Sequence, residues 1–115
     1  MRRRRLSSKA LPVARVFAGG YHTCALSVDG DLLCFGEGNG GKLGQGDERN
    51  ILNPEDVDPI ELSERVVDVS LGDLFTCAVL ESGLLRCFGA PTGTGQGQRG
   101  DNLILAPLDA APVRL

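Results

Sequence analysis

At 115 residues, with 42% hydrophobic and 23% charged residues, the chain has the length and composition of one globular domain, which excludes a disordered tail. Its single histidine argues against Ser-His-Asp catalysis and a histidine-based metal site, and no apolar run approaches the roughly 20 residues that span a bilayer. Residues 10–115 carry seven basic against fifteen acidic side chains, and this balance of −8 should repel nucleic acid.

The first nine residues form a basic leader without any acidic side chain. Its bases are Arg2, Arg3, Arg4, Arg5 and Lys9. The leader lacks the apolar stretch of a secretory signal, so a cytoplasmic or nuclear location is favoured. The arginine run is open to several interpretations: a nuclear address, an anion-binding tail or a disordered solubilising leader. Contact with nucleic acid is expected only through Arg2–Arg5.

Short strands are expected directly after the leader, at 13–18, 21–27 and 31–35. The first is a run rich in β-branched residues that ends at a glycine and is too short to nucleate a helix. The second and third are separated by Val28, Asp29 and Gly30. A three-residue loop with glycine in third place is typical of a type I turn closed by a bulge, which predicts a β-hairpin.

That turn places two cysteines opposite each other. With residues 28–30 as the loop, Cys24 on one strand faces Cys34 on the next. Directly opposed Cβ atoms lie about 4.5–5.5 Å apart, which allows a disulfide across the hairpin. Two reduced, buried thiols remain an equal alternative, because no secretory signal indicates an oxidising compartment. The nine-residue spacing and the lack of a nearby histidine pair disfavour zinc.

Residues 36–42 satisfy the G-x-x-x-x-G-K pattern of a phosphate-binding loop. Such a loop must open a helix, and Leu43 occupies the position where Ser or Thr would hold magnesium. We therefore interpret residues 36–46 as a glycine-built turn that binds no nucleotide. The proline-containing segment that ends at 59–62 is predicted to be an edge strand, because proline is tolerated there.

The second half of the chain repeats the first at an offset of 53 residues. Thr23-Cys24-Ala25 recurs as Thr76-Cys77-Ala78, and Cys34-Phe35-Gly36 recurs as Cys87-Phe88-Gly89. The predicted copies are residues 10–62 and 63–115. The second copy should therefore form strands at 66–71, 74–80 and 84–88, a Cys77–Cys87 pair, and an edge strand at 112–115.

His22 is the only imidazole, and its counterpart in the second copy is Phe75. A position that accepts either ring is better explained by packing between the two units than by catalysis. We expect a backbone carbonyl to accept the hydrogen bond of the imidazole N–H.

The repeated unit resembles a known family. The order Gly19-Gly20, His22-Thr23, Ala25-Leu26, Cys34-Phe35-Gly36 and Leu43-Gly44-Gln45-Gly46 is similar to the repeat of the regulator of chromosome condensation family. The resemblance implies an all-β fold, a β-propeller that is usually closed by seven such blades. Two blades cannot close a ring, since propellers need at least about four. The expected architecture is therefore a partial β-propeller of two blades of short antiparallel strands, part of a larger propeller.

The family has diverse functions, so the fold alone does not give the function. No nucleophile-base pair, metal cluster or cofactor loop supports an enzyme, and no cofactor is expected. The sequence predicts a protein-interaction or scaffold module. The alternative is a guanine-nucleotide exchange factor for a small GTPase, which the resemblance to the founding member implies.

The variable glycine-rich loops at 36–50 and 89–103 are the expected partner-binding surfaces. Their candidate contact residues are Glu37, Asn39, Lys42, Asp47, Arg49 and Arg99. An isolated pair of blades should also leave two outer faces bare and self-associate through them. The apolar residues expected on those faces are Leu26, Leu32, Val79 and Leu85.

Overall fold

The computed structural model describes residues 12–90, which form two three-stranded antiparallel sheets. Sheet 1 has the order β1-β2-β3, and sheet 2 has the order β4-β5-β6. Short 3-10 turns η1 and η2 lie between the sheets in the sequence. The bounds are β1 Val13–Ala18, β2 His22–Ser27, β3 Leu32–Gly36, η1 Asn39–Gly41, η2 Pro54–Asp56, β4 Val66–Leu71, β5 Phe75–Leu80 and β6 Leu85–Gly89. The three strands expected in each copy before its glycine-rich loop are thus confirmed to within one residue at each end.

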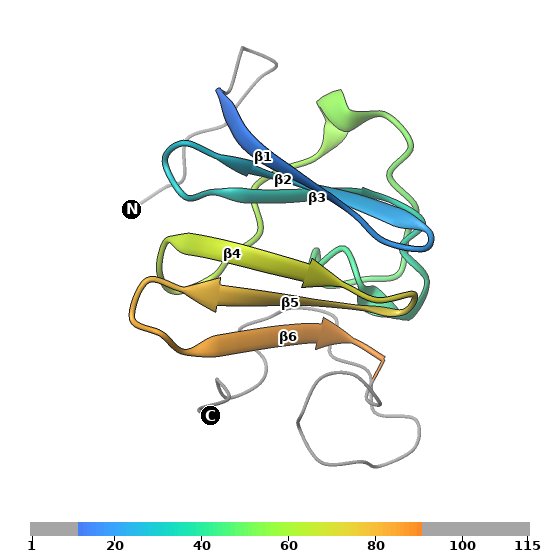
Figure 1. Cartoon of the computed structure of the whole chain (residues 1–115). Coiled ribbons are helices and arrows are strands. Elements are labelled where there is room, and N and C mark those ends of the chain that lie inside the picture. Colours follow the sequence, from blue (N-terminus) through green and yellow to red (C-terminus); the bar gives the residue numbers. More distant parts are fainter. Residues whose placement is uncertain (1–11, 91–115) are drawn as a thin grey trace.

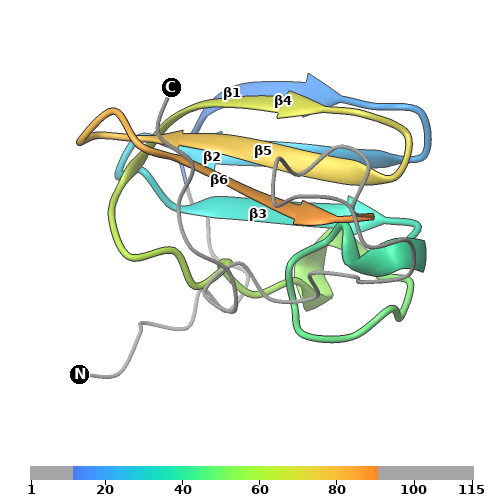
Figure 2. The ribbon, with the colours of Figure 1, turned by 90° about the horizontal axis from the view of Figure 1, so that it is seen from below.

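The two sheets are stacked face to face (Figure 1). Their strands run in the same order, so β1 lies over β4 (Figure 2). The space between the sheets is filled by a single apolar cluster to which both sheets and the connecting loop contribute. Its buried members are Cys24, Leu26, Leu32, Cys34, Leu43, Ile60, Val66, Val69, Ala78, Leu80 and Phe88. Burial of this cluster holds one sheet against the other.

The β2–β3 hairpin has the three-residue turn that the sequence predicts. The Gly30 amide donates to the carbonyl of Ser27 at 3.0 Å, and the Ser27 amide donates to the carbonyl of Asp31 at 2.9 Å. Gly30 has a φ of +89° and lies against Arg65, whose Cβ would be 2.8 Å from an added Cβ. A larger residue at position 30 would therefore be strained and would collide with the start of sheet 2. The β5–β6 hairpin repeats the turn around Gly83, where φ is +93°.

The register gives each sheet two distinct faces. His22, Cys24 and Leu26 alternate along β2 and point toward sheet 2, and we call their side the rear face of sheet 1. The opposite side is the front face, which in sheet 1 carries Val13, Val16, Ala18, Thr23, Ala25, Leu33 and Phe35. The equivalent front face of sheet 2 points toward sheet 1 and carries Val66, Val69, Leu71, Thr76, Ala78, Arg86 and Phe88. The seam between the sheets therefore joins the rear face of sheet 1 to the front face of sheet 2.

The edge strand expected at 59–62 is not present. Ile60 donates one backbone hydrogen bond to Leu32, at 2.8 Å, and Ile51 forms an isolated antiparallel bridge with Gly36. Pro59 has no amide hydrogen, and Ile60 turns its side chain into the core with 3% exposure, so the segment cannot continue a regular ladder. The counterpart expected at 112–115 lies outside the described residues.

Two of the four apolar residues expected on bare outer faces are corrected. Leu26 and Leu32 are 5% and 1% exposed, because they lie on the rear face of sheet 1, which sheet 2 covers. Val79 and Leu85 pair with each other on the rear face of sheet 2, the side away from sheet 1, where both are half-buried. Within residues 12–90, no helix has the length and apolar character needed to cross a membrane.

Candidate interaction surface

The loop at residues 36–58, which follows β3, is held in shape by its own hydrogen bonds. Gly36 and Ile51 exchange backbone bonds of 2.7 and 2.9 Å across the base of the loop. Farther out, the Gly38 amide donates to Asn50 Oδ1 at 2.9 Å, and the Gly40 amide donates to Glu48 Oε1 at 2.9 Å. The loop therefore has a fixed conformation, in which side-chain oxygens accept the backbone hydrogen bonds that a neighbouring strand would accept in a sheet.

Lys42, expected as a partner contact, is buried. Its side chain is fully inaccessible, and its Nζ donates to Glu37 Oε1 at 2.8 Å and lies 5.4 Å from the centre of the Tyr21 ring. A buried ammonium needs such a counter-charge, so Lys42 and the half-buried Glu37 form an internal pair. The loop turns inward here because Leu43 enters the core with 1% exposure.

Three other candidate residues lie at or near the surface of the loop. Asn39 and Arg49 are exposed, and Asp47 is half-buried. The Arg49 Nε donates to Asp47 Oδ2 at 2.8 Å, and this hydrogen bond lowers the pKa of the Asp47 carboxyl. The sixth candidate, Arg99, lies outside the described residues.

A shallow pocket of about 200 Å³ adjoins these residues on the loop surface. Arg49, Ile51 and Leu52 form part of its lining, together with the acidic residues Asp56 and Asp58. Leu52 is 81% exposed, which makes it an unusual apolar group on a polar loop. Leu52 is not among the partner contacts expected from the sequence, although its counterpart in the second copy, Leu105, is the same apolar residue.

The loop lacks the geometry of a phosphate-binding site. The glycines of its phosphate-loop pattern lead into η1, a single 3-10 turn of three residues, rather than a helix whose amides could face an anion. The Lys42 ammonium that would contact phosphate is bound to Glu37 instead. Among residues 12–90, no group of three or more His, Cys, Asp or Glu side chains is placed to hold a metal ion.

His22 lies inside the seam rather than at the loop surface. Its Nε2 is 2.7 Å from the Thr76 hydroxyl, so its partner is a side chain of sheet 2 and not the backbone carbonyl that was expected. Its Nδ1 is buried and has no hydrogen-bond partner among the described residues. Burial and the nearby Lys42 ammonium lower the pKa of His22 from 6.5 to about 4, against an opposing contribution from Glu37.

The four cysteines lie in the pairs that the hairpin register predicts. Cys24 faces Cys34 and Cys77 faces Cys87, with Cα–Cα distances of 4.0 Å in both hairpins and Sγ atoms at bonding distance. Cys24 and Cys34 are 0% exposed in the seam, whereas Cys77 is half-buried on the rear face of sheet 2. A disulfide in each hairpin is therefore geometrically accessible.

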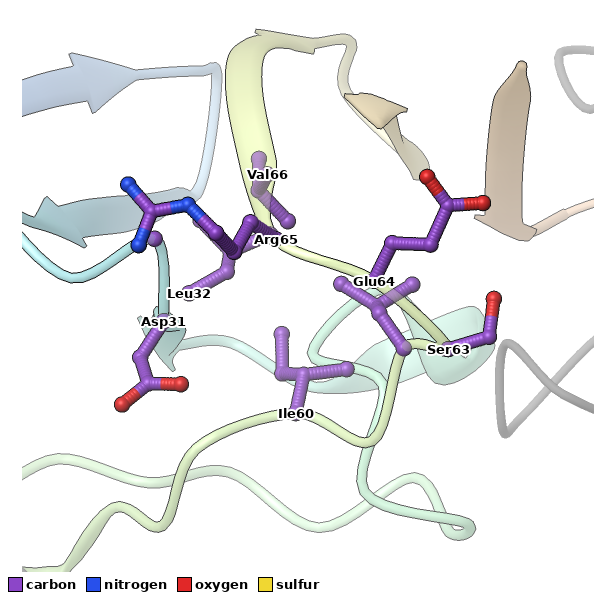
Figure 3. Close-up of a pocket in the computed structure, with 9 residues that line it drawn as sticks. Asp31, Leu32, Ile60, Ser63, Glu64, Arg65 and Val66 are labelled. Atoms are coloured by element: carbon purple, nitrogen blue, oxygen red, sulfur yellow. The ribbon is translucent and has the colours of Figure 1, made fainter. Parts of the chain in front are cut away.

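A second cavity, of about 250 Å³, lies where sheet 1 continues into sheet 2 (Figure 3). Leu32, Ile60 and Val66 supply its apolar wall. Two of the polar groups around it have partners: the Glu64 carboxylate accepts from the amide and the hydroxyl of Ser82, each at 2.9 Å, and Arg65 donates to the carbonyl of Asp29. The Arg65 bond ties the start of sheet 2 to the β2–β3 turn of sheet 1, and the Glu64 bonds fix the β5–β6 turn of sheet 2, so we assign the cavity a structural role at the joint.

Stacked three-stranded antiparallel sheets, with a glycine-rich loop of the first closing over the second, define a section of a β-propeller. The chain belongs to the regulator of chromosome condensation (RCC1) repeat family. One model of this repeat matches residues 29–79, and a second matches residues 13–42 and 66–98.

Named relatives show the same repeat within much longer proteins. The chain is 37% identical over 84 residues to human probable E3 ubiquitin-protein ligase HERC3, covering 73% of this chain and 8% of that protein. It is 38% identical over 80 residues to the regulator of chromosome condensation of Xenopus laevis, covering 68% and 18%. The chain thus spans less than a fifth of either relative.

Solved structures support the fold. Yeast RCC1 (Prp20), in its complex with Kap60, matches with a TM-score of 0.74 at 18% identity, covering 93% of this chain and 26% of that one. Human WBSCR16 matches with a TM-score of 0.70 at 22% identity, covering 83% and 25%. The two matches show that this architecture tolerates extensive change of sequence.

Proposed function

We propose that the chain is a protein-interaction module whose partner surface is the loop at residues 36–58. The observation that carries this proposal is the 81% exposure of Leu52 on a loop that is otherwise fixed by internal hydrogen bonds. A preorganised loop loses little entropy when it binds, and an exposed leucine can serve as its apolar anchor. The Asn39 and Arg49 side chains add polar contacts beside it.

The charge of the loop favours a basic partner. Residues 36–58 contain six acidic and two basic side chains, and one of the two bases, Lys42, is buried against Glu37. Such a surface attracts a positively charged protein and repels nucleic acid. For one structural relative, the Prp20p protein of Saccharomyces cerevisiae, binding to Gsp1p and to histones is described. Histones are basic proteins, and they are therefore suitable first probes for this chain.

The test compares histone binding by the unmodified chain and by a Leu52→Ser variant. Loss of a buried leucine side chain costs about 1.5–3 kcal/mol, so the variant should bind at least about tenfold more weakly. Val28→Ser is the matched control, because Val28 is 54% exposed at the turn on the opposite end of the hairpin. Raising the salt concentration should weaken binding of both the unmodified chain and the control.

The alternative, guanine-nucleotide exchange, is measured in parallel with fluorescent nucleotide release from a panel of small GTPases. Stimulated release that depends on Leu52 would replace the proposed role with exchange. Equal histone affinities for the Leu52→Ser and Val28→Ser variants would exclude the loop as the partner surface.

A further inference from the structure

The pocket of about 200 Å³ on the loop at residues 36–58, which we call the loop pocket, has both apolar and acidic walls. Ile51 and Leu52 form its apolar side, where Leu52 is 81% exposed. Asp56 and Asp58 also line it, and both residues are exposed. These walls suit a side chain that is apolar along its length and positively charged at its end.

The backbone after η2 places both carboxylates on the same side of the chain. Val57, which lies between the two aspartates, has extended backbone angles, with φ of −91° and ψ of 141°, and is 7% exposed. Neighbouring side chains of an extended segment point to opposite sides. Because Val57 is buried, Asp56 and Asp58 both point away from the interior, toward the loop pocket.

Hydrogen bonds within the loop hold the walls of the loop pocket in place. The Gln45 side-chain amide donates to the carbonyl of Asp58 at 3.1 Å. Asn53 caps η2, because its Oδ1 accepts from the Glu55 amide at 3.0 Å. Ile51 is fixed by its antiparallel bridge to the end of β3. The pocket is therefore formed before a partner binds, which lowers the entropy cost of binding.

Arg49 also borders the loop pocket, but its charge is compensated by a neighbour. Its Nε donates to Asp47 Oδ2 at 2.8 Å. An ion pair of this kind cancels much of the positive charge at a distance. The carboxylates of Asp56 and Asp58 therefore dominate the charge of the pocket, which favours a cation.

We propose that the loop pocket binds an arginine side chain of the partner protein, an assignment that rests on the proposed function of the loop. The planar guanidinium group carries several N–H donors and can donate to the Asp56 and Asp58 carboxylates together. Its methylene groups lie against Ile51 and Leu52. A lysine ammonium is more strongly hydrated and cannot form the same planar contact, so it binds the pocket more weakly.

Two synthetic peptides test this choice of side chain. In the first, arginine and leucine alternate, and in the second, lysine replaces each arginine, so the two peptides have the same length and charge. Fluorescence anisotropy measures their dissociation constants with the full chain. The arginine peptide should bind at least about threefold more tightly than the lysine peptide. Equal affinities would overturn the assignment of arginine.

Asp56→Asn tests the pocket itself, because it removes a charge and keeps the size of the side chain. It should weaken binding of the arginine peptide at least about tenfold. Glu55→Gln is the matched control: it removes the same charge from the same 3-10 turn, but Glu55 does not line the loop pocket. The control should weaken binding by less than about threefold. Equal weakening by the two variants would overturn the proposal, because the overall charge of the loop would then account for binding.

Thermal unfolding of the variants, measured first, shows whether each of them folds. If Asp56→Asn unfolds, Asp56→Ser, which also suits a turn, takes its place in the comparison. The Leu52→Ser variant separates this proposal from the proposed function. If Leu52→Ser loses the arginine peptide while Asp56→Asn retains it, the loop is still the partner surface, but the loop pocket does not bind arginine. Equal affinities of Leu52→Ser and Val28→Ser for the peptide would instead contradict the role of the loop.

Discussion

The Nε2 atom of His22 lies 2.7 Å from the hydroxyl oxygen of Thr76, 54 residues farther along the chain. The Thr76 hydroxyl has one hydrogen, which it donates to the carbonyl of Lys42 at 2.7 Å. It must therefore accept from the imidazole, and this assigns the His22 proton to Nε2. The three groups form a continuous chain of hydrogen bonds between sheet 1, its loop and sheet 2. Thr76 and His22 are 0% and 3% exposed, so these hydrogen bonds take the place of the bonds to water that both side chains lose inside the seam.

Thr76→Val should lower the free energy of unfolding by about 1–3 kcal/mol. The substitution keeps the shape of the side chain but leaves the His22 N–H and the Lys42 carbonyl without this partner. Thr23→Val is the matched control at the equivalent, half-buried position and should change stability by less than about 0.5 kcal/mol. Chemical denaturation measures both effects. Equal losses of stability in the two variants would show that the contact between the Thr76 hydroxyl and His22 does not stabilise the seam.

The stability of the chain should carry a pH-dependent contribution from His22. Its pKa is about 4 in the folded chain, against 6.5 for the ordinary group, so between these values the unfolded chain binds a proton that the folded chain does not. Stability therefore falls as the pH is lowered from about 6.5 to about 4, by about 3 kcal/mol in total, and is unaffected by this group at higher pH.

His22→Phe introduces the residue found at the equivalent position 75 and removes this titration. As the pH falls from about 6.5 to about 4, the unfolding free energy of the unmodified chain should decrease relative to that of the variant, because only the unmodified chain loses the histidine contribution. Parallel curves would mean that the imidazole is protonated equally in the folded and unfolded states.

Gly44→Ala should destabilise the chain more than Gly46→Ala. Both glycines have positive φ angles, +74° and +87°, which cost a residue with a Cβ about 1–2 kcal/mol. At Gly44 the new Cβ would also lie 2.8 Å from the Phe88 ring and 3.0 Å from Ile60, whereas at Gly46 it would meet nothing within 4 Å. Overpacking should therefore add about 1–3 kcal/mol at Gly44. Thermal melting of the two variants tests this difference, and equal melting temperatures would contradict the close packing of the loop on sheet 2.

If both cysteine pairs are oxidised, the Cys77–Cys87 bond should be reduced before the Cys24–Cys34 bond. Cys77 is half-buried on the rear face of sheet 2, while Cys24 and Cys34 are 0% exposed in the seam. A reducing thiolate must reach the sulfur, so reduction of the buried bond requires the sheets to separate. Alkylation during mild reduction, followed by peptide mass analysis, gives the order. Recovery of a Cys24–Cys77 peptide from the unreduced chain would instead contradict the strand register.

The sequence by itself determined the local parts of this structure. A glycine in third place after Val28 and Asp29 defined the turn, and the turn defined the register that sets Cys24 opposite Cys34. Because the sequence repeats at an offset of 53 residues, the same hairpin was predicted for the second half of the chain. These features depend on neighbouring residues, whose backbone preferences and alternation can be read along the chain.

Only the tertiary structure decided which residues meet across the seam. Lys42 has the sequence context of an exposed loop but is buried, because Leu43 draws the loop over Phe88. Ile60, expected in an edge strand, instead buries its side chain in the same core. His22 bonds Thr76, a partner that local sequence cannot indicate, although the recurrence of threonine in both copies was a signal that could have been used. These contacts depend on how one sheet packs against the other. Packing between segments more than 30 residues apart in the sequence is determined by side-chain shape and burial, which the local sequence pattern does not specify.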